Sequence, residues 1–156
     1  MLYKIIIQKF NNKNFKNIQD LTDVIYNNFI YLNQFPELIH NKNEIQRLLK
    51  SSTKSCYLAT YKNKLIGYLI GEYKFLHDGK YAFFISYIYV ISPFRSKNIG
   101  KFLMNKIIHE CKQKNIKFIA LTCYTKDTKV VDFYTKKYKF VRNSNYNRHN
   151  LFTLII

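Results

Sequence analysis

The chain has 156 residues, enough for one domain over 1–156 with its own hydrophobic core, and we expect no second domain. Hydrophobic residues make up 47% of it, with only two prolines and four glycines, so the composition excludes a disordered or low-complexity chain. Twenty-six Lys and Arg against nine Asp and Glu give a net charge of +17, which is typical of proteins that bind nucleic acid, an anionic surface or an anionic ligand.

The first half of the chain predicts a strand, two helices and a hairpin. Apolar residues recur every three or four positions from Ile18 to Leu32, which indicates an amphipathic helix, and Phe35-Pro36 ends it. Gly67 and Gly71 lie on one face of a predicted strand, where another backbone could approach closely. The predicted elements are the strand Tyr3–Gln8, the helices Ile18–Leu32 and Glu44–Lys50, and the hairpin strands Cys56–Tyr61 and Leu65–Phe75.

The second half predicts a strand, helix and strand that form a right-handed crossover, then a helix and a closing pair of strands. Tyr81–Ile91 is almost continuously apolar, so both of its faces should be covered and it belongs at the sheet centre. The fold class is therefore α/β (α+β), with a mixed sheet of about six to seven strands and about four helices. The other elements are Lys101–Lys114, Ile116–Cys123, Thr128–Tyr138, Phe140–Arg142 and Leu151–Ile156.

A basic turn joins the central strand to the helix that follows it. The first N–H groups of a helix lack intrahelical partners and its dipole is positive at that end, so the turn could hold a pyrophosphate. Arg95, Lys97 and Lys101 would add full charges around the anion. The alternative is an ordinary solvated connection between a strand and a helix.

The segment Arg95-Ser-Lys-Asn-Ile-Gly100 resembles the Arg/Gln-x-x-Gly-x-Gly/Ala loop of the GNAT superfamily of N-acetyltransferases, and the order of elements resembles that fold. Asn98 stands where the first glycine is usual, and Asn tolerates a left-handed backbone better than other non-glycine residues. The resemblance implies acetyl-CoA as cosubstrate. It would be bound by Arg95, Ser96, Lys97, Asn98, Ile99, Gly100 and Lys101, with the main chain of Ile88 and Val90 along the pantetheine arm.

The segment Asp127-Thr-Lys-Val-Val-Asp-Phe-Tyr134 resembles the family's Asn-x-x-Ala-x-x-x-Tyr helix. The resemblance implies that Tyr134 protonates the departing thiolate. A thiol has an unperturbed pKa near ~8.5 and a phenol near ~10, so a phenol can donate to a thiolate in a dry site. Asp127 replaces the family's Asn and would sit poorly against a phosphate, so we expect it to cap the helix.

The acceptor amine must attack as a free base. A lysine amine is neutral at pH 7 in about one molecule in a few thousand, and an α-amine in roughly one in five to ten. Among the nine acidic residues only Glu72 falls in a predicted central strand, so it is the candidate base, with Tyr87 or Tyr89 in a water relay. This shortage favours an α-amine. Residues 100–104 and 121–122 also resemble the protein N-alpha-acetyltransferases that modify histone tails.

Two other functions fit the sequence. An amino-sugar-phosphate or other small-amine acetyltransferase would explain the positive charge through an anionic substrate. A basic RNA- or ribosome-associated module on the same fold would explain it through nucleic acid. The charge has a further explanation in the abundance of Lys, Asn, Ile and Tyr, whose codons are rich in A and T.

The remaining expectations concern metals, membranes and location. The three cysteines and four histidines form no ligand pair at metal spacing, so we expect reduced thiols and no metal. Tyr81–Ile91 is the longest apolar stretch and is far shorter than the ~20 residues of a membrane span, so we expect no membrane association. These features predict a cytoplasmic or nuclear protein, and no pattern indicates its oligomeric state.

Overall fold

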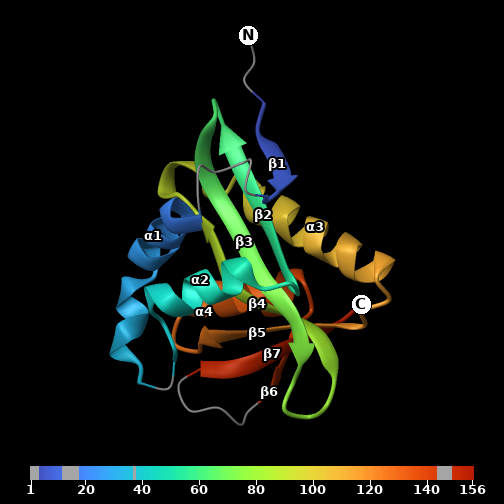
Figure 1. The fold of residues 1–156 in the computed structure, drawn as a ribbon. Coiled ribbons are helices and arrows are strands. Elements are labelled where there is room, and N and C mark those ends of the chain that lie inside the picture. Colours follow the sequence, from blue (N-terminus) through green and yellow to red (C-terminus); the bar gives the residue numbers. More distant parts are fainter. Residues whose placement is uncertain (1–3, 12–17, 37, 144–148) are drawn as a thin grey trace.

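A seven-stranded mixed sheet forms the centre of the molecule in the computed structural model, which describes residues 4–11, 18–36, 38–143 and 149–156 (Figure 1). The strand order is β1-β2-β3-β4-β5-β7-β6, and β4 pairs with β5 in parallel while the other neighbours are antiparallel. This confirms the predicted mixed sheet. The strands are β1 Ile6–Lys9, β2 Lys54–Tyr61, β3 Lys64–Phe75, β4 Tyr81–Val90, β5 Phe118–Tyr124, β6 Val141–Asn143 and β7 His149–Ile155. Tyr3, where we predicted the first strand to begin, lies outside the described residues.

The described α-helices are α1 Ile18–Asn28, α2 Lys42–Lys50, α3 Ile99–Gln113 and α4 Thr128–Asp132. The first predicted helix is shorter than expected, because the chain passes into a 3₁₀ turn over Ile30–Gln34. The second begins earlier than expected, because the Asn41 side chain caps it by accepting a 2.8 Å hydrogen bond from the Glu44 N–H. The last helix continues from α4 as a π turn over Phe133–Lys137. Within the described residues, no helix has the length and apolar character to cross a bilayer.

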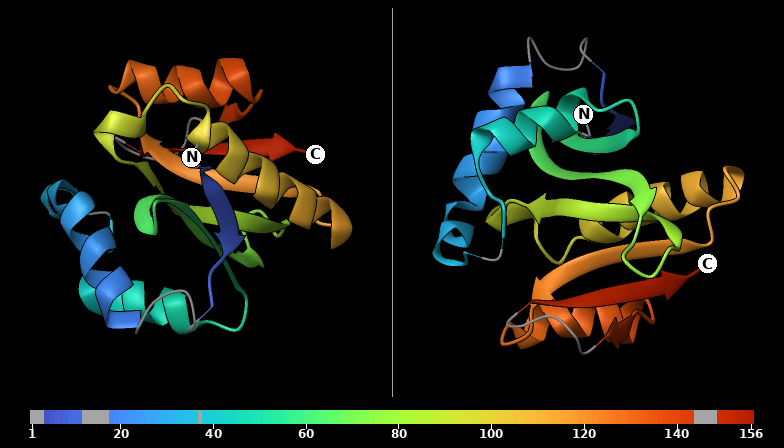
Figure 2. Two further views of the ribbon diagram at one scale, coloured as in Figure 1. Left: turned by 90° about the horizontal axis from the view of Figure 1, so that it is seen from above. Right: turned by 60° about the horizontal axis from the view of Figure 1, so that its bottom comes forward.

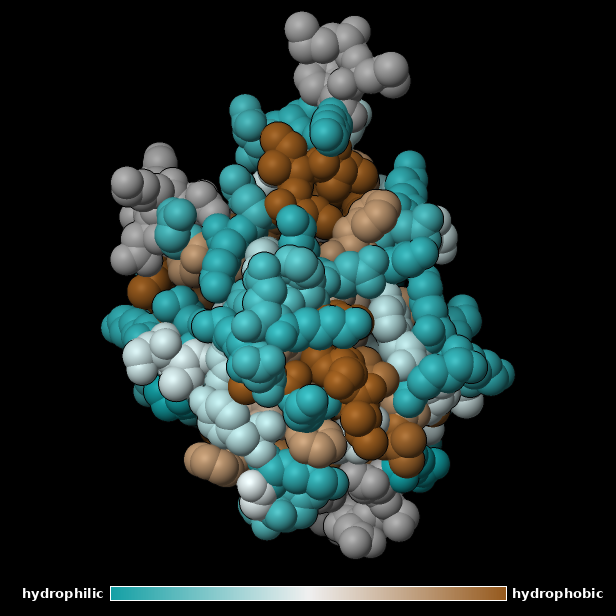
Figure 3. Space-filling model, turned by 90° about the vertical axis from the view of Figure 1, so that its right-hand side faces the viewer, coloured by the Kyte–Doolittle hydropathy of each residue, from teal (hydrophilic) through white to brown (hydrophobic). Residues whose placement is uncertain are grey.

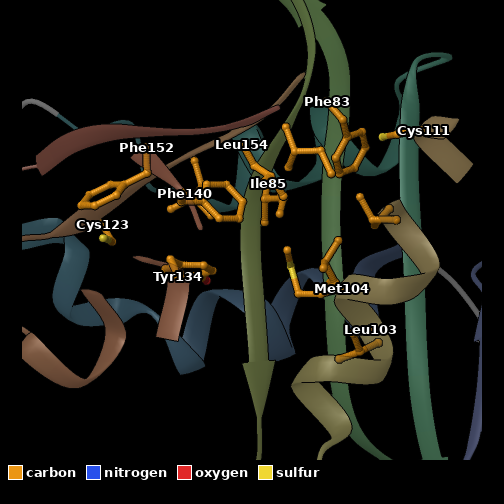
Figure 4. Packing of buried hydrophobic residues seen from close by; sticks show 14 of the residues in the cluster. Phe83, Ile85, Leu103, Met104, Cys111, Cys123, Tyr134, Phe140, Phe152 and Leu154 are labelled. Carbon is orange, nitrogen blue, oxygen red and sulfur yellow. The ribbon is translucent and has the colours of Figure 1, made fainter. Parts of the chain in front are cut away.

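The helices cover the two faces of the sheet in pairs (Figure 2). On the α1–α2 face, Leu21 of α1 and Leu48 of α2 pack with Tyr68 and Tyr87 of the sheet. On the α3–α4 face, Leu103 and Met104 of α3 belong to a cluster with Phe83, Ile85 and Phe152 of the sheet (Figure 4). The prediction that the strand from Tyr81 is covered on both faces is confirmed.

A β-bulge interrupts β4 at Ser86. Consecutive residues of β3, Ile70 and Gly71, pair with Tyr87 and Ile85, so β4 has one residue more than β3 there. The extra residue inverts the alternation of side chains, and Ile85 therefore faces α3 while Tyr87 faces α1 and α2. A Cβ on Gly71 would lie 2.1 Å from the Phe84 carbonyl oxygen, which confirms the predicted close approach at this glycine.

The central parallel pair separates just before this bulge. β4 and β5 are paired only from Ala82 with Phe118 to Ile85 with Leu121. Beyond that point β4 continues to Val90 and β5 to Tyr124 without a paired position between them. The sheet is thus split at its centre. The gap between β4 and β5 is open toward both the α1–α2 face and the α3–α4 face.

Candidate active site

A cavity of about 640 Å³ occupies the split in the sheet. Its lining includes Leu48 and Tyr87 from the core of the α1–α2 face, and Ile85 and Tyr134 from the core of the α3–α4 face. It therefore connects the two faces through the sheet. The unpaired ends of the two central strands contribute Ser86, Tyr87 and Ile88 on one side, and Thr122, Cys123 and Tyr124 on the other.

The main chain of Ile88 and Val90 faces the split. Ile91 N–H donates to the Ile66 carbonyl at 2.9 Å, which makes that pair hydrogen-bonded across β3 and β4. In an antiparallel ladder the hydrogen-bonded positions alternate, so the N–H and C=O groups of Ile88 and Val90 point away from β3. The Val90 carbonyl accordingly accepts a 2.9 Å hydrogen bond from Arg95 Nε on that side. The assigned contacts to a pantetheine arm are main-chain contacts, and these groups have the orientation that such contacts require.

The turn before α3 has the conformation expected of an anion-binding loop. Asn98 has φ 62° and ψ 13°, which confirms that asparagine can adopt the left-handed conformation of the family's glycine. Ser96 also has a positive φ, of 61°. The first helical hydrogen bond runs from Phe102 N–H to the Asn98 carbonyl. The N–H groups of residues 99–101 have no hydrogen-bond acceptor in the described part of the chain, so a ligand can accept from them.

The side chains of this turn are mostly turned to solvent. Arg95 is held in place, because its Nε bonds Val90 and its guanidinium lies 5.4 Å from the Tyr89 ring centroid. Lys97 and Lys101 are exposed, and Ile99 is fully buried, so it can contribute only its main chain. This turn, residues 95–101, thus combines free amides with one held and two exposed positive charges, and its residues fit a pyrophosphate.

Tyr134 lies in the π turn after α4 and lines the cavity from the α3–α4 face. Its side chain is only 5% exposed and sits beside Cys123 and Phe140 (Figure 4). Burial raises the pKa of the Tyr134 hydroxyl, so it carries its proton at neutral pH. This is the state that a proton donor needs, and its role in catalysis stays a prediction. Asp127 accepts a hydrogen bond from the Val130 N–H, which confirms its role as a helix cap.

Glu72 lines the cavity but is engaged by Arg47. The guanidinium donates to both carboxylate oxygens, at 2.8 and 3.3 Å, and the Ser51 hydroxyl lies 3.4 Å away. The hydrogen bonds from Arg47, followed by opposing burial, leave the pKa of Glu72 below its usual value. A carboxylate with a lowered pKa is a weaker base. The geometry therefore favours a role in holding Arg47, and the assignment of Glu72 as general base stays a prediction that the contacts do not strengthen.

Of the two tyrosines proposed for a relay, Tyr87 lines the cavity, whereas Tyr89 is not part of its lining and packs under Arg95. The Tyr87 hydroxyl lies 2.9 Å from His40 Nδ1. Sequence reasoning missed His40, because it stands alone between two predicted helices, with no other catalytic residue type at a characteristic spacing from it. Only the tertiary structure brings these two side chains together.

The charge balance of the cavity is opposite to that of the chain. Its lining contains the carboxylates of Glu44, Glu72 and Asp127, but only Arg47 and Lys74 as formal cations. Arg47 also bonds both Glu44 and Glu72, so its charge is largely satisfied within the protein. A chain with a net charge of +17 therefore has a cavity with an excess of negative groups.

A second cavity, of about 490 Å³, lies where Ile5 and Ile7 meet Phe102 of α3. The lining of this second cavity contains no carboxylate, and only Lys106 and His109 among its lining residues are ionisable.

The face of the molecule in Figure 3 is largely hydrophilic, with hydrophobic side chains gathered in a few areas. Within the described residues, no group of three or more His, Cys, Asp and Glu side chains could hold a metal ion.

The comparisons with known proteins bear on the whole fold. Arabidopsis thaliana NAA60 in complex with acetyl-CoA has a TM-score of 0.72 at 12% identity, over 98% of this chain and 99% of that chain. The PaiA N-acetyltransferase from Thermoplasma acidophilum in complex with coenzyme A has a TM-score of 0.71 at 17% identity, covering 98% and 99%. Arabidopsis thaliana Naa50 with the bisubstrate analogue CoA-Ac-MVNAL has a TM-score of 0.69 at 18% identity, covering 97% and 99%. At these identities the likeness shows the fold.

No curated protein matches the sequence. A family model does, however: the model described as the acetyltransferase (GNAT) family matches residues 17–140. That range includes the split strands, the basic loop before α3 and Tyr134. With most of its length matched by this model, the chain belongs to the GNAT family of acetyltransferases.

Proposed function

We propose that this protein is an acetyl-CoA-dependent N-acetyltransferase that transfers acetyl directly to a primary amine, and that its favoured acceptor is the N-terminal α-amine of a peptide or protein. The observation that carries the proposal is the cavity through the split sheet, which is lined from both helical faces and includes acidic groups. Two substrates can meet in such a cavity from opposite faces, as direct transfer requires.

The α3–α4 face supplies the binding of the cosubstrate. The free amides of residues 99–101, with Arg95, Lys97 and Lys101, hold the pyrophosphate, and the main chain of Ile88 and Val90 holds the pantetheine arm. Acetyl-CoA supplies the activated acetyl carbonyl when it is bound. Tyr134 then donates its proton to the departing thiolate, in a site where a bare thiolate would be costly.

The charges of the cavity favour an amine over an anionic substrate. An ammonium group entering it meets Glu44, Glu72 and Asp127, whereas a sugar phosphate would meet the same carboxylates with Arg47 already engaged. The positive charge of the chain lies elsewhere on the molecule. This argues against an amino-sugar phosphate as the acceptor and leaves an uncharged small amine as the second candidate.

The preference for an α-amine rests on basicity. Glu72 is held by Arg47 and has a lowered pKa, so it gives little help in deprotonating a lysine amine. An α-amine has a pKa of about 8 and needs far less help. The Naa50 neighbour, solved with the analogue CoA-Ac-MVNAL, supports the peptide class, although an aminoglycoside acetyltransferase from a soil metagenome is also a neighbour.

A matched-peptide assay with labelled acetyl-CoA tests the proposal. One peptide has a free N-terminus and no lysine, and its counterpart has a blocked N-terminus and one internal lysine. We expect faster turnover of the first, and preference for the blocked peptide would overturn the α-amine assignment. Glucosamine and glucosamine 6-phosphate serve as further acceptors, and a preference for the phosphorylated sugar would favour the small-anion alternative.

The non-enzymatic alternative is distinguished by its ligands. A cosubstrate site predicts that CoA raises the melting temperature. A basic RNA-associated module predicts RNA binding that weakens steeply with salt and no response to CoA. Observing the second pattern alone would overturn the enzymatic proposal.

A further inference from the structure

His40 is a buried histidine at the proposed acceptor end of the cavity, and it has no role in the steps proposed for Tyr134 and Glu72. It lies between the 3₁₀ turn and α2, is 5% exposed, and lines the cavity. Its ring is stacked on Tyr26 of α1, with centroids 5.3 Å apart and planes within 5°. The adjacent Asn41 caps α2, so the main chain next to His40 is fixed. The ring is therefore held in one orientation from two sides.

The two nitrogens of the ring have different surroundings. Nδ1 lies 2.9 Å from the Tyr87 hydroxyl, while the buried Nε2 has no hydrogen-bond partner among the described residues. A neutral imidazole has one donor and one acceptor nitrogen. A hydroxyl that donates to Nδ1 places the imidazole hydrogen on Nε2. Nδ1 is then an acceptor, and protonating it gives a cation without any rearrangement of the ring.

The Tyr87 hydroxyl cannot act as a base without a second group. Burial, with a smaller effect of the Glu44 charge, raises its pKa to about 12, so a free tyrosinate in the cavity would be costly. The hydroxyl can take a proton from a substrate only if it passes its own proton on in the same step. Burial lowers the pKa of His40, which leaves the imidazole neutral at pH 7 and able to receive that proton.

We propose that Tyr87 and His40 form the proton relay that removes the proton from the acceptor amine, with Tyr87 in contact with the amine and His40 as the positioning residue behind it. The proposal rests on the proposed function. The amine proton passes to the Tyr87 oxygen, directly or through one water, while the Tyr87 proton passes to His40 Nδ1. The amine, now neutral, attacks: the C–N bond to the acetyl carbon forms and the C–S bond breaks. The nitrogen loses its second proton to water, and Tyr134 protonates the thiolate. His40 afterwards returns its proton to solvent, and Tyr134 regains one from it.

The charges around His40 come from three elements. Tyr26 of α1 stacks on the ring and has Lys42 Nζ 5.4 Å from its own ring centroid. On α2, Lys42 is paired with Asp23 of α1, and Glu44 is paired with Arg47. From β4 only the Tyr87 hydroxyl faces the imidazole among the described contacts. Each of these formal charges thus has a partner of opposite sign, so the protonation of His40 is not tied to one unpaired neighbour.

The test uses the full chain with His40→Gln, Tyr87→Phe and the double variant. A glutamine oxygen can accept the Tyr87 hydrogen bond but cannot take up its proton. General bases contribute at least about 100-fold, so we expect kcat with an N-terminal α-amine peptide to fall by about that factor in each single variant. We expect the double variant to be no slower than the slower single one, because the two groups act as a unit. The KM for acetyl-CoA and the thermal shift with CoA should stay unchanged.

Two readouts separate a relay from a merely structural role. The first is the pH dependence of kcat, whose acid limb should move upward in His40→Gln, toward the pKa of about 8 of the acceptor amine itself. The second is a matched peptide with an N-terminal aminooxyacetyl group, whose nitrogen is already unprotonated at neutral pH. The kcat ratio of wild type to His40→Gln should shrink toward one with that acceptor. The control is His109→Gln in the second cavity, which should match the wild type in both readouts.

The relay is overturned if His40→Gln keeps kcat within about threefold, a change well below that of a lost general base, and leaves the acid limb at the wild-type pH. It is equally overturned if the loss is the same with both acceptors. If His40→Gln fails to show the CoA thermal shift, Tyr87→Phe, which removes one oxygen and keeps the ring, decides by the same two readouts. An active wild type with unaffected variants rejects only the relay, whereas a wild type that acetylates no amine rejects the proposed function itself.

Discussion

The two ends of the candidate site are built in different ways. On the α3–α4 face, the loop of residues 95–101 and the cap and tyrosine of the segment 127–134 are each one continuous stretch of sequence. On the α1–α2 face, the cavity collects His40, Glu72 and Tyr87 from a loop and two different strands. The end assigned to the common cosubstrate is thus encoded locally, and the end assigned to the acceptor is encoded by long-range packing.

The two ends also differ in charge. The loop carries Arg95, Lys97 and Lys101, with no carboxylate between residues 91 and 109. The acceptor end carries Glu44 and Glu72, both bound to Arg47. A single chain of high positive charge therefore presents one end suited to a pyrophosphate and another suited to an ammonium group. The net charge of the whole chain describes neither end by itself.

The largest effect is expected from a substitution at the bulge between β3 and β4, which should disturb both ends of the site. Gly71→Ala would place a Cβ 2.1 Å from the Phe84 carbonyl oxygen, so the backbone at the bulge must shift. We expect a loss of about 3 kcal/mol in the free energy of unfolding, measured with urea, together with loss of turnover. Gly100→Ala is the control for stability, because its Cβ would lie 3.6 Å from Phe133, an ordinary contact. Equal stability of the two variants would contradict the strain at the bulge.

Removing the Tyr134 hydroxyl tests the α3–α4 face alone. Tyr134→Phe keeps the ring against Phe140, whose centroid is 5.5 Å away, and removes the proposed proton donor. We expect kcat to fall about 100-fold with the melting temperature little changed. Tyr138→Phe removes a nearby buried hydroxyl that has no partner among the described residues, so kcat should hold and stability should rise by up to about 1 kcal/mol. An unchanged kcat in Tyr134→Phe would refute its assignment as the donor.

A buried carboxylate outside the cavity gives a pH test of the α3–α4 face. Glu110 of α3 is 6% exposed, and although burial raises its pKa, four hydrogen-bond donors leave the pKa of Glu110 below its usual value. Glu110→Gln should lower the free energy of unfolding at pH 7 by about 2 kcal/mol, because buried donors lose a charged acceptor. The donors are Ser55 at 2.9 Å, Tyr57 and Tyr73 at 2.7 Å each, and Lys9 at 3.2 Å.

The sign of the pH dependence follows from the lowered pKa. The stability that Glu110 contributes is complete above the unfolded pKa of about 4.3 and is lost as the pH falls through the lower folded value. Urea titrations of wild type and Glu110→Gln should therefore differ fully at pH 7 and pH 6 and converge below about pH 4. A difference that grows on acidification would contradict the lowered pKa. Turnover at neutral pH should be affected less than in Tyr134→Phe, since Glu110 does not line the cavity.

The smallest expected effect concerns the charge of the loop. Arg95→Glu removes the hydrogen bond to Val90 and reverses a charge beside the free amides. We expect CoA to bind about tenfold more weakly, which corresponds to about 1.4 kcal/mol, and the thermal shift with CoA to shrink accordingly. Lys106→Glu, exposed in the middle of α3, makes the same change in net charge away from the loop and should leave CoA affinity unchanged. Equal losses in both variants would mean that long-range charge, and not the loop, determines affinity.

Much of the α3–α4 face could be predicted from the sequence. The apolar run from Tyr81, the basic turn and the cap at Asp127 are local patterns, and the structure confirms the strand, the left-handed Asn98 and the cap. Local patterns suffice here because a helix N-terminus presents its amides whatever packs around it. The end of the first helix was not predictable in the same way, since Phe29 and Leu32 continue the apolar spacing although the chain is a 3₁₀ turn from Ile30.

The amino-acid sequence by itself determined the element order, the left-handed turn at Asn98 and the helix cap at Asp127, because each depends on neighbours in the chain. Only the tertiary structure decided that Ser86 bulges out of β4, that Glu72 is bound by Arg47, and that Tyr87 meets His40 across 47 positions of sequence. The physical reason is strand register. One extra residue reverses which face every later side chain of the strand occupies, and this depends on pairing with β3 and not on local preference.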